Sequence, residues 1–312
     1  MKLSPPTKGL LLSLLGFAAF SISDAFSKLL TGRLNPFEVA FSGGVFGLLL
    51  VPFVKTRGQS WLNILPIQKP GMWWIRAVAT FIATAASVES FMLLSMPEAL
   101  SLMFLMPFIA TILSVVALKE KVSPWGWVAV AIGFAGVLIV LRPGVRPLHF
   151  GHACALAAAI ASAVNVIAYR VAGTGTTKLG VLGSSLAGPL LGDGLLALPN
   201  FTWPDTVADW GNLFGYGFLA ALGQLLIMLA ATLTPASRVA LPQYTQMVWA
   251  VLFSYTLFHE PLDKWTIIGV TVVTLSGMLD WFRKHLLILK QRRLARKQAR
   301  LQPANPTPAD AK

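Results

Sequence analysis

The sequence predicts an all-α integral membrane protein whose ten transmembrane helices form two inverted five-helix repeats. Three observations carry this prediction: a strongly apolar composition, ten apolar segments of spanning length, and one segment that occurs twice. Hydrophobic residues make up 55% of the 312 residues and charged residues 12%, whereas soluble domains carry about 25% charged residues. The mean hydropathy of +0.69 agrees with a chain that lies mostly in lipid.

The first apolar segment runs from about residue 9 to residue 30, close to the roughly 20 residues that a spanning helix requires. A cleaved signal peptide is the alternative, but its apolar region would be shorter, whereas this one continues through Asp24 and Lys28. The other nine segments lie near 36–54, 72–95, 97–118, 124–141, 150–171, 178–199, 212–233, 235–258 and 265–285.

The repeated segment occupies residues 97–120 and returns at 235–260, each time from a proline to a glutamate. Ser123 follows Glu120 at the spacing at which Asp263 follows Glu260, and a tryptophan comes two residues later in both copies. Serine and aspartate are good N-cap residues, so both should begin the next helix. We assign Glu120 and Glu260 to holding the turn, because an acid at a helix C-terminus needs a partner.

The duplication divides the chain into a first repeat over 1–143, a second over 149–285 and a basic tail over 286–312. Each repeat holds five predicted helices, and an odd number forces the second copy to enter the bilayer in the opposite orientation. Inverted repeats are typical of carriers that alternate access around a site near the middle of the membrane. The symmetry therefore indicates transport.

Basic residues predict the orientation, because cytoplasmic loops are enriched in Lys and Arg. With both termini in the cytoplasm, only Arg33, Arg142, Arg146 and Lys264 fall on the outer side. We therefore expect a multi-pass protein of the cell inner (plasma) membrane with both termini cytoplasmic.

The closing glutamates, Pro107 before the first of them, and Ala129 and Gly269 nine positions after them resemble the drug/metabolite transporter superfamily, EamA type. The resemblance covers about 10–285, although the second copy has Met247 where the first has Pro107. It implies a secondary transporter that moves a small organic metabolite by alternating access.

Two stretches further resemble uptake carriers of S-adenosylmethionine or flavin-like metabolites: 21–30, SISDAFSKLL, and 241–255, LPQYTQMVWAVLFSY. An exporter of amino acids or drugs of the same superfamily is the alternative. Coupling to protons is left open at this point.

Polar residues inside the predicted helices are the candidates for the substrate pathway, because such residues are costly in lipid and tend to be functional. They are Asp24, Lys28, Glu89, Asn165, Gln243, Tyr244, Gln246 and Trp249. Asp24 and Lys28, four residues apart, should share a helix face as an ion pair, either facing the interior or at the interface. Glu89 is either a proton carrier or a neutral acid bonded between helices. Asp193, between two glycines, is expected to bond two helices together.

Pro107 and Pro242 lie inside predicted helices, where each removes one backbone hydrogen bond. Such a break is tolerated in a membrane where it lines a polar cavity or where a neighbour satisfies the backbone. The fourth and ninth helices are therefore either part of the pathway or simply kinked for packing.

Other classes of protein fit poorly. A lipid-phosphate enzyme of the membrane would need clustered acids or a phosphate cradle, which the sequence lacks, and we expect no cofactor. His149, His152 and the single Cys154 make only a weak metal motif, so no metal is expected. The net charge of +13 gathers in loops and in the tail. We expect the tail to bind anionic lipid and not nucleic acid, because it lacks aromatic residues for base stacking. The sequence leaves the oligomeric state open.

Overall fold

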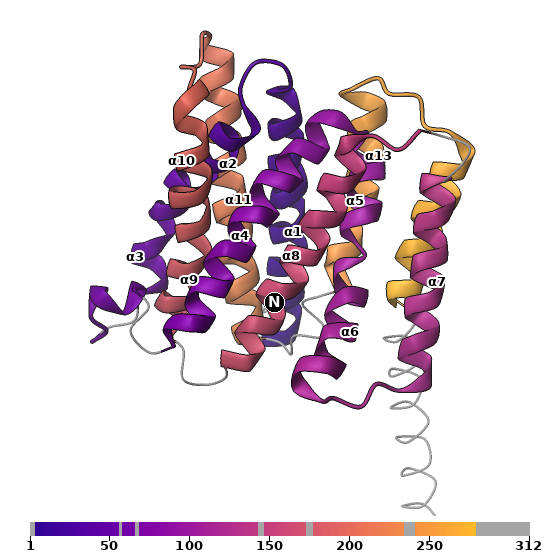
Figure 1. The fold of residues 1–312 in the computed structure, drawn as a ribbon, viewed down its shortest axis with the longest axis horizontal. Coiled ribbons are helices and arrows are strands. Elements are labelled where there is room, and N and C mark those ends of the chain that lie inside the picture. Colours follow the sequence, from indigo (N-terminus) through magenta and orange to yellow (C-terminus); the bar gives the residue numbers. More distant parts are fainter. Residues whose placement is uncertain are drawn as a thin grey trace, which may run out of the picture.

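The computed structural model describes residues 4–55, 58–65, 69–142, 147–172, 177–233 and 241–278, and all regular structure within these ranges is helical. Eight of the described helices are long and apolar enough to cross a membrane, and they lie side by side as one bundle (Figure 1). A membrane protein is built this way because a helix satisfies its own backbone hydrogen bonds in lipid. The predicted tail over 286–312 lies outside the described residues.

The first half of the chain forms helices at each of its predicted segments. They are α1 (Pro5–Leu29), α2 (Pro36–Gly47) with its continuations η1 (Leu48–Leu50) and α3 (Val51–Val54), η2 (Trp61–Ile64), α4 (Pro70–Leu93), α5 (Met96–Met103), α6 (Met106–Leu118) and α7 (Pro124–Leu141). Proline occupies one of the first two positions in α1, α2, α4 and α7, where its missing N–H costs no hydrogen bond.

The second half follows the same pattern. Its elements are α8 (Phe150–Ala172), α9 (Lys178–Ala187), the π-helical turn η4 (Gly188–Asp193), α10 (Gly194–Ala197), η5 (Leu198–Asn200), α11 (Val207–Leu233), η6 (Leu241–Tyr244), α13 (Thr245–Thr256) and a last described helix at Lys264–Met278. Helix α1 packs along α11 and α4 packs along α8, so the two halves of the chain are interleaved.

The fourth predicted helix is broken within the bilayer. Helix α5 ends at Met103, and α6 begins at Met106 with Pro107 at its second position. Proline has no backbone N–H to donate, and its ring clashes with the carbonyl four residues earlier. The helix is therefore interrupted at Phe104 and Leu105, just before Pro107. Pro242 lies in η6, immediately before α13 begins.

Helix α11 begins before its apolar run. The predicted segment starts near residue 212, but the helix starts at Val207 and includes Asp209 and Trp210. Thr206 Oγ1 accepts a hydrogen bond from the Asp209 N–H over 3.1 Å, and an acid is favourable in the first turn of a helix. Capping thus extends the helix by more than one turn beyond the apolar run.

The bundle has two chemically different ends. One end, which we call the basic end, carries Lys55, Lys69, Lys119, Lys121, Arg170 and Lys178 at the helix termini. Lys69 at the start of α4 donates a hydrogen bond to the carbonyl of Ala172 at the end of α8, which joins two of these termini. The other end, which we call the opposite end, holds the 30–35 turn and the start of α11 (Figure 1).

Glycines bring α7 and the helix at Lys264–Met278 into close contact. A Cβ atom on Gly133 would lie 2.9 Å from Ser276 Oγ, and one on Gly136 would lie 2.9 Å from Val273 Cγ2. A Cβ atom on Gly136 would also lie 2.9 Å from the backbone N of Val273, and one on Gly133 would lie 2.2 Å from the Phe108 ring of α6. The two helices are therefore packed through their backbones, the way small residues act in membrane bundles.

Candidate functional site

A polar cavity of about 540 Å³ lies at the basic end of the bundle, between helices from both halves of the chain. Its walls come from α4, α8, α9 and α11. The lining residues are Arg76, Asn165, Val166, Tyr169, Lys178, Val181, Leu182, Ser185, Gln224, Ile227, Met228 and Thr232. Small-molecule sites are concave and mostly apolar with a few placed polar groups, and this cavity has that character.

Arg76 is the charged residue at the wall of the cavity that is most buried, with a relative exposure of 7%. Its Nε donates to Ser184 Oγ over 3.0 Å, and its Nη2 donates to Ser185 Oγ over 3.1 Å. Its guanidinium carbon lies 5.3 Å from the centre of the Tyr169 ring, in a cation–π arrangement. These contacts hold the guanidinium in one place without neutralising it.

The charge of Arg76 has no acidic partner among the described residues. Neutral hydroxyls and one aromatic face surround it, and Lys178 adds a second positive charge to the wall. Burying an ion without a counter-ion is costly, so the site favours a ligand that brings an anionic group. Arginine is suited to this because its planar donors match a carboxylate or a phosphate.

Two amide side chains also line the cavity. Asn165 on α8 donates from Nδ2 to Thr80 Oγ1 over 3.2 Å, which orients its amide against α4. Gln224 lines the wall from α11. Amide side chains can donate and accept at once, so they can pair with a heterocyclic ring edge or with an amino acid group.

Ion pairs and charged hydrogen bonds gather at the opposite end of the bundle. Lys28 Nζ lies 2.8 Å from Glu260 Oε1, and Arg33 Nη1 lies 2.8 Å from Asp209 Oδ1. Arg142 pairs with Asp263, which joins the end of α7 to the start of the helix at Lys264–Met278. His152 on α8 also lies 3.1 Å from Glu98 on α5. These four pairs connect helix ends across the bundle. They lie at the opposite end from the cavity, whereas the Arg170–Glu120 pair lies at the basic end.

Lys28 does not pair with Asp24, as the sequence analysis expected from their spacing. Its ammonium reaches Glu260 instead, and it donates to the carbonyls of Phe91 and Leu94 at the end of α4. A helix C-terminus attracts a cation through its free carbonyls, which a pattern of residues four apart cannot reveal. The predicted ion pair within α1 is therefore wrong.

The two closing glutamates both contact the first helix of the other half of the chain. Glu120 pairs with Arg170 on α8, and Glu260 pairs with Lys28 on α1 while accepting a hydrogen bond from Ser254. The expected local partner is present at Glu260, in Ser254. At Glu120 the partner comes from a distant helix.

The turns after these glutamates begin as expected from the sequence. Ser123 Oγ accepts from the Gly126 N–H over 3.3 Å, and Asp263 Oδ1 accepts from the N–H groups of Trp265 and Thr266 over 2.8 and 3.0 Å. Both side chains thus cap the helix that follows them.

Of the predicted pathway residues, Asn165 lines the cavity and the others lie elsewhere. Glu89 lies on α4 and is partly buried. Tyr244 packs edge-on against Phe104 with ring centres 5.8 Å apart. Gln246 is buried and Gln243 is partly buried near the start of α13. Trp249 stacks on Phe253 and lines an apolar groove between α13 and α1.

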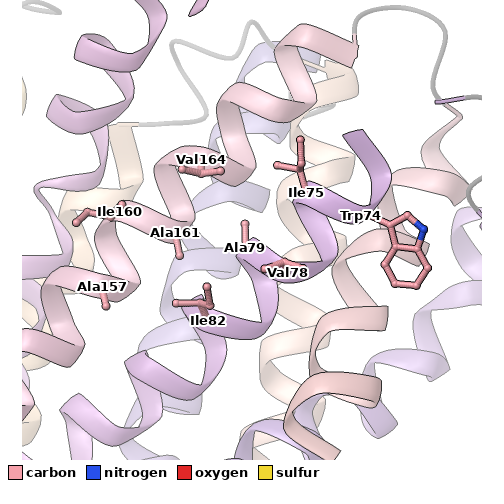
Figure 2. Close-up of a pocket in the computed structure, with 9 residues that line it drawn as sticks. All are labelled: Trp74, Ile75, Val78, Ala79, Ile82, Ala157, Ile160, Ala161 and Val164. Carbon is pink, nitrogen blue, oxygen red and sulfur yellow. The ribbon is translucent and has the colours of Figure 1, made fainter. Parts of the chain in front are cut away.

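A second hollow, between α4 and α8, differs sharply from the cavity. All nine of its lining side chains are apolar, from Trp74 to Ile82 on α4 and from Ala157 to Val164 on α8 (Figure 2). A surface of this kind suits lipid chains and offers no polar group to orient a metabolite. Helices α4 and α8 line both hollows, but only the cavity around Arg76 has charged and amide side chains in its wall.

Sequence reasoning missed Arg76, Tyr169, Lys178, Ser185 and Gln224 as site residues. Arg76 was counted only as a basic residue near the end of a helix. Its position inside the predicted segment 72–95 was the available signal, because a charge within a span is functional more often than not. Gln224 likewise lies inside the predicted segment 212–233.

Comparison with known proteins identifies the family of this chain. The model of the EamA-like transporter family matches residues 7–142 and again residues 149–279. An S-adenosylmethionine uptake transporter of Rickettsia bellii is 26% identical over 268 residues, covering 83% of this chain and 88% of that protein. Solute carrier family 35 member G1 of Homo sapiens is 25% identical over 310 residues, covering 89% and 80%.

One solved crystal structure shares the fold, with a TM-score of 0.61 and 17% identity, covering 90% of this chain and 99% of the other. The family model matches most of the chain, in two consecutive parts. The matches cover 88% and 80% of the two relatives named above. This chain therefore belongs to the EamA-like transporter family, within the drug/metabolite transporter superfamily, and is a multi-pass membrane protein.

Proposed function

We propose that the chain carries a metabolite of the S-adenosylmethionine type across the cell inner membrane, and that the cavity around Arg76 is its binding site. The observation that carries this proposal is the buried guanidinium without a counter-ion in a polar cavity of an otherwise apolar bundle. S-adenosylmethionine carries a sulfonium and an ammonium group as well, but it has a carboxylate for Arg76 and Lys178 and an adenine for the amides. The uptake transporters of Rickettsia support this substrate class.

We infer that each half of the chain supplies five of ten helices and that the two halves are related as an inverted repeat. Such a repeat is the usual basis of alternating access. The spacing from Glu120 to Glu260 carries Gly133 onto Val273 and Gly136 onto Ser276. The contact of Gly133 with Ser276 and that of Gly136 with Val273 are thus the same contact seen from each half. Such a reciprocal pair supports a two-fold axis between the repeats.

The closing turns support the same repeat. Lys119 and His259 both have a φ of 53°, and the next N–H donates six residues back, from Glu120 to Ser114 over 3.3 Å and from Glu260 to Ser254 over 2.9 Å. A left-handed residue is common at a helix end, and both turns add the same closure over six residues. Equal geometry at the same spacing favours duplication over coincidence.

In the proposed cycle the cavity is open toward the basic end, which we place in the cytoplasm. Lys28 with Glu260, Arg33 with Asp209 and Arg142 with Asp263 then close the outer end. Opening to the outside requires these contacts to break while the basic end closes. The conformation described here is accordingly the inward-facing one.

Uptake into proteoliposomes tests the substrate class. Labelled S-adenosylmethionine should accumulate with saturation in vesicles that contain the protein. S-adenosylhomocysteine should compete more strongly than adenosine or methionine, because each of the latter offers only half of the recognised groups. Uptake no faster than in protein-free vesicles would contradict the substrate, and saturable transport of free amino acids in its place would favour an exporter of amino acids.

Labelling from the two sides of the membrane tests the inverted topology. Lys121→Cys and Lys264→Cys, each in a Cys154→Ser background, place single thiols at exposed sites that follow the two closing glutamates. An impermeant maleimide added to intact cells should label Lys264→Cys and should label Lys121→Cys only after lysis. Labelling of both variants from the same side would exclude the inverted repeat.

A further inference from the structure

The π-helical turn η4 places an acid inside the bundle without full hydrogen bonding. Asp193, its last residue, is fully buried, with a relative exposure of 0%. Its Oδ2 accepts a hydrogen bond from Thr84 Oγ1 of α4 over 2.7 Å, whereas its Oδ1 has no partner among the described residues. A buried polar atom without a partner is rare and costly, and π-helical turns are frequent at functional sites.

A phenol and a second acid lie on helices packed around the turn. Tyr216 of α11 is 8% exposed, and its carbonyl accepts a hydrogen bond over 2.7 Å from Ser23, the residue before Asp24 on α1. Its ring lies against Gly43 of α2, where a Cβ atom would come within 3.0 Å of it. The Asp24 carboxylate makes no hydrogen bond or ion pair within the described ranges.

No described cation neutralises these two acids. On α1, Lys28 is held by Glu260, and on α4, Arg76 is held by serines two turns away from Thr84. The other titratable groups on the helices packed around the turn are also engaged or distant. Glu38 of α2 bonds to Thr202, Asp209 of α11 pairs with Arg33, Glu89 lies more than one turn beyond Thr84, and Lys178 of α9 lies at the basic end.

We propose that Asp193 is the proton-binding site of the transporter, with Asp24 and Tyr216 on the neighbouring helices, and that it is separate from the substrate cavity. This inference rests on the proposed transport function and names its coupling ion. An ionised carboxylate is costly in an apolar surrounding, and one bound proton removes the buried charge of Asp193. A metal ion is a poorer occupant, since the described residues contain no group of three His, Cys, Asp or Glu side chains that could hold one.

Helix geometry places Asp193 one layer away from the cavity. On α4 the step from Arg76 to Thr84, the partner of Asp193, is eight residues, and on α11 the step from Gln224 back to Tyr216 is also eight. At a rise of 1.5 Å per residue, each step amounts to about 12 Å toward the opposite end. Two helices thus agree on the separation.

A chain of hydrogen bonds along α4 joins the two layers. Asn165, in the cavity wall, donates to Thr80 Oγ1 over 3.2 Å. Thr84 Oγ1 lies 2.9 Å from the Thr80 carbonyl and 2.7 Å from Asp193 Oδ2, and its single hydrogen can serve only one of them at a time. A change in the protonation of Asp193 therefore changes the hydrogen bonding of Thr84 on α4, the helix that carries Arg76.

Water on the outer side of the membrane supplies the proton, and water on the inner side accepts it. With Asp193 ionised, the Thr84 hydroxyl donates to it. When a proton from the outer water binds Oδ2, the new carboxyl O–H donates to Thr84 Oγ1, and the Thr84 hydrogen turns to the Thr80 carbonyl. Release of the same proton to the inner water restores the first arrangement, with no change in any covalent bond other than O–H.

The test compares uptake of labelled S-adenosylmethionine with and without an inward proton gradient, together with carboxyl infrared spectra of the full-length protein. In the wild type an acidic exterior should raise the initial rate several-fold. In Asp193→Asn and Thr84→Val this ratio should fall toward one, whereas the control Asp205→Asn, at an exposed loop position, should keep it. The spectrum should show a protonated carboxyl band that disappears in Asp193→Asn.

The outcomes separate this inference from the proposed function. Uptake that ignores a proton gradient, or that follows a sodium gradient instead, would overturn the proton site while leaving the transporter intact. Wild-type vesicles that take up no S-adenosylmethionine would contradict the substrate class, and the infrared band then decides on Asp193 alone. A carboxyl band that persists unchanged in Asp193→Asn would exclude the site.

Discussion

Arg76→Gln should raise the substrate concentration for half-maximal uptake about 10- to 100-fold. Hydrogen bonds to a charged group contribute roughly 1.5–3 kcal/mol, and roughly 1.4 kcal/mol corresponds to a tenfold change in affinity. Glutamine keeps polar atoms near Ser184 and Ser185 but loses the charge that the cavity offers to a carboxylate. The measurement is the initial rate of uptake over a range of substrate concentrations in proteoliposomes.

Two variants make this prediction specific. Arg76→Lys should lose less than Arg76→Gln, because it retains the charge but not the planar donors. Lys264→Gln is the control, since Lys264 is an exposed basic residue at the opposite end that has no part in the proposed cycle. Equal effects of Arg76→Gln and Lys264→Gln, at equal amounts of inserted protein, would place the substrate outside the cavity.

Reversing one charge of the Lys28–Glu260 pair should strongly reduce both transport and thermal stability. Lys28 is 9% and Glu260 27% exposed, so the pair lies between a surface pair, at roughly 0–1 kcal/mol, and a buried pair, whose disruption costs roughly 3–5 kcal/mol. Lys28→Glu alone puts two acids together. The double variant Lys28→Glu/Glu260→Lys should recover part of both properties.

A second ion pair supplies the matched control for this experiment. Arg170 and Glu120, the pair that the proposed repeat makes equivalent, lie at the basic end with 44% and 41% of their side chains exposed. Water screens such a pair, so Arg170→Glu should change stability by less than roughly 1 kcal/mol. If the double variant at Lys28 and Glu260 behaves no better than either single variant, the pair does not close the outer end.

Local information determined the class and the helices. The length of each apolar run depends only on consecutive residues and on the thickness of a bilayer, so all eight long spans coincide with predicted segments. Caps are local as well, which is why Ser123 and Asp263 begin their helices as the sequence indicated. Where the prediction of a boundary failed, at Asp209, the cap at Thr206 lay outside the apolar run.

Only the tertiary structure decided which polar groups meet. The sequence singled out Asp24 and Lys28 as partners because they are near in the chain, but Lys28 contacts Glu260, which is distant in the sequence. Arg76, Tyr169 and Gln224 come from three helices, and no spacing rule connects them before those helices pack. The physical reason is that helix formation is governed by neighbours along the chain, whereas a cavity is governed by the side chains that two distant faces leave unfilled.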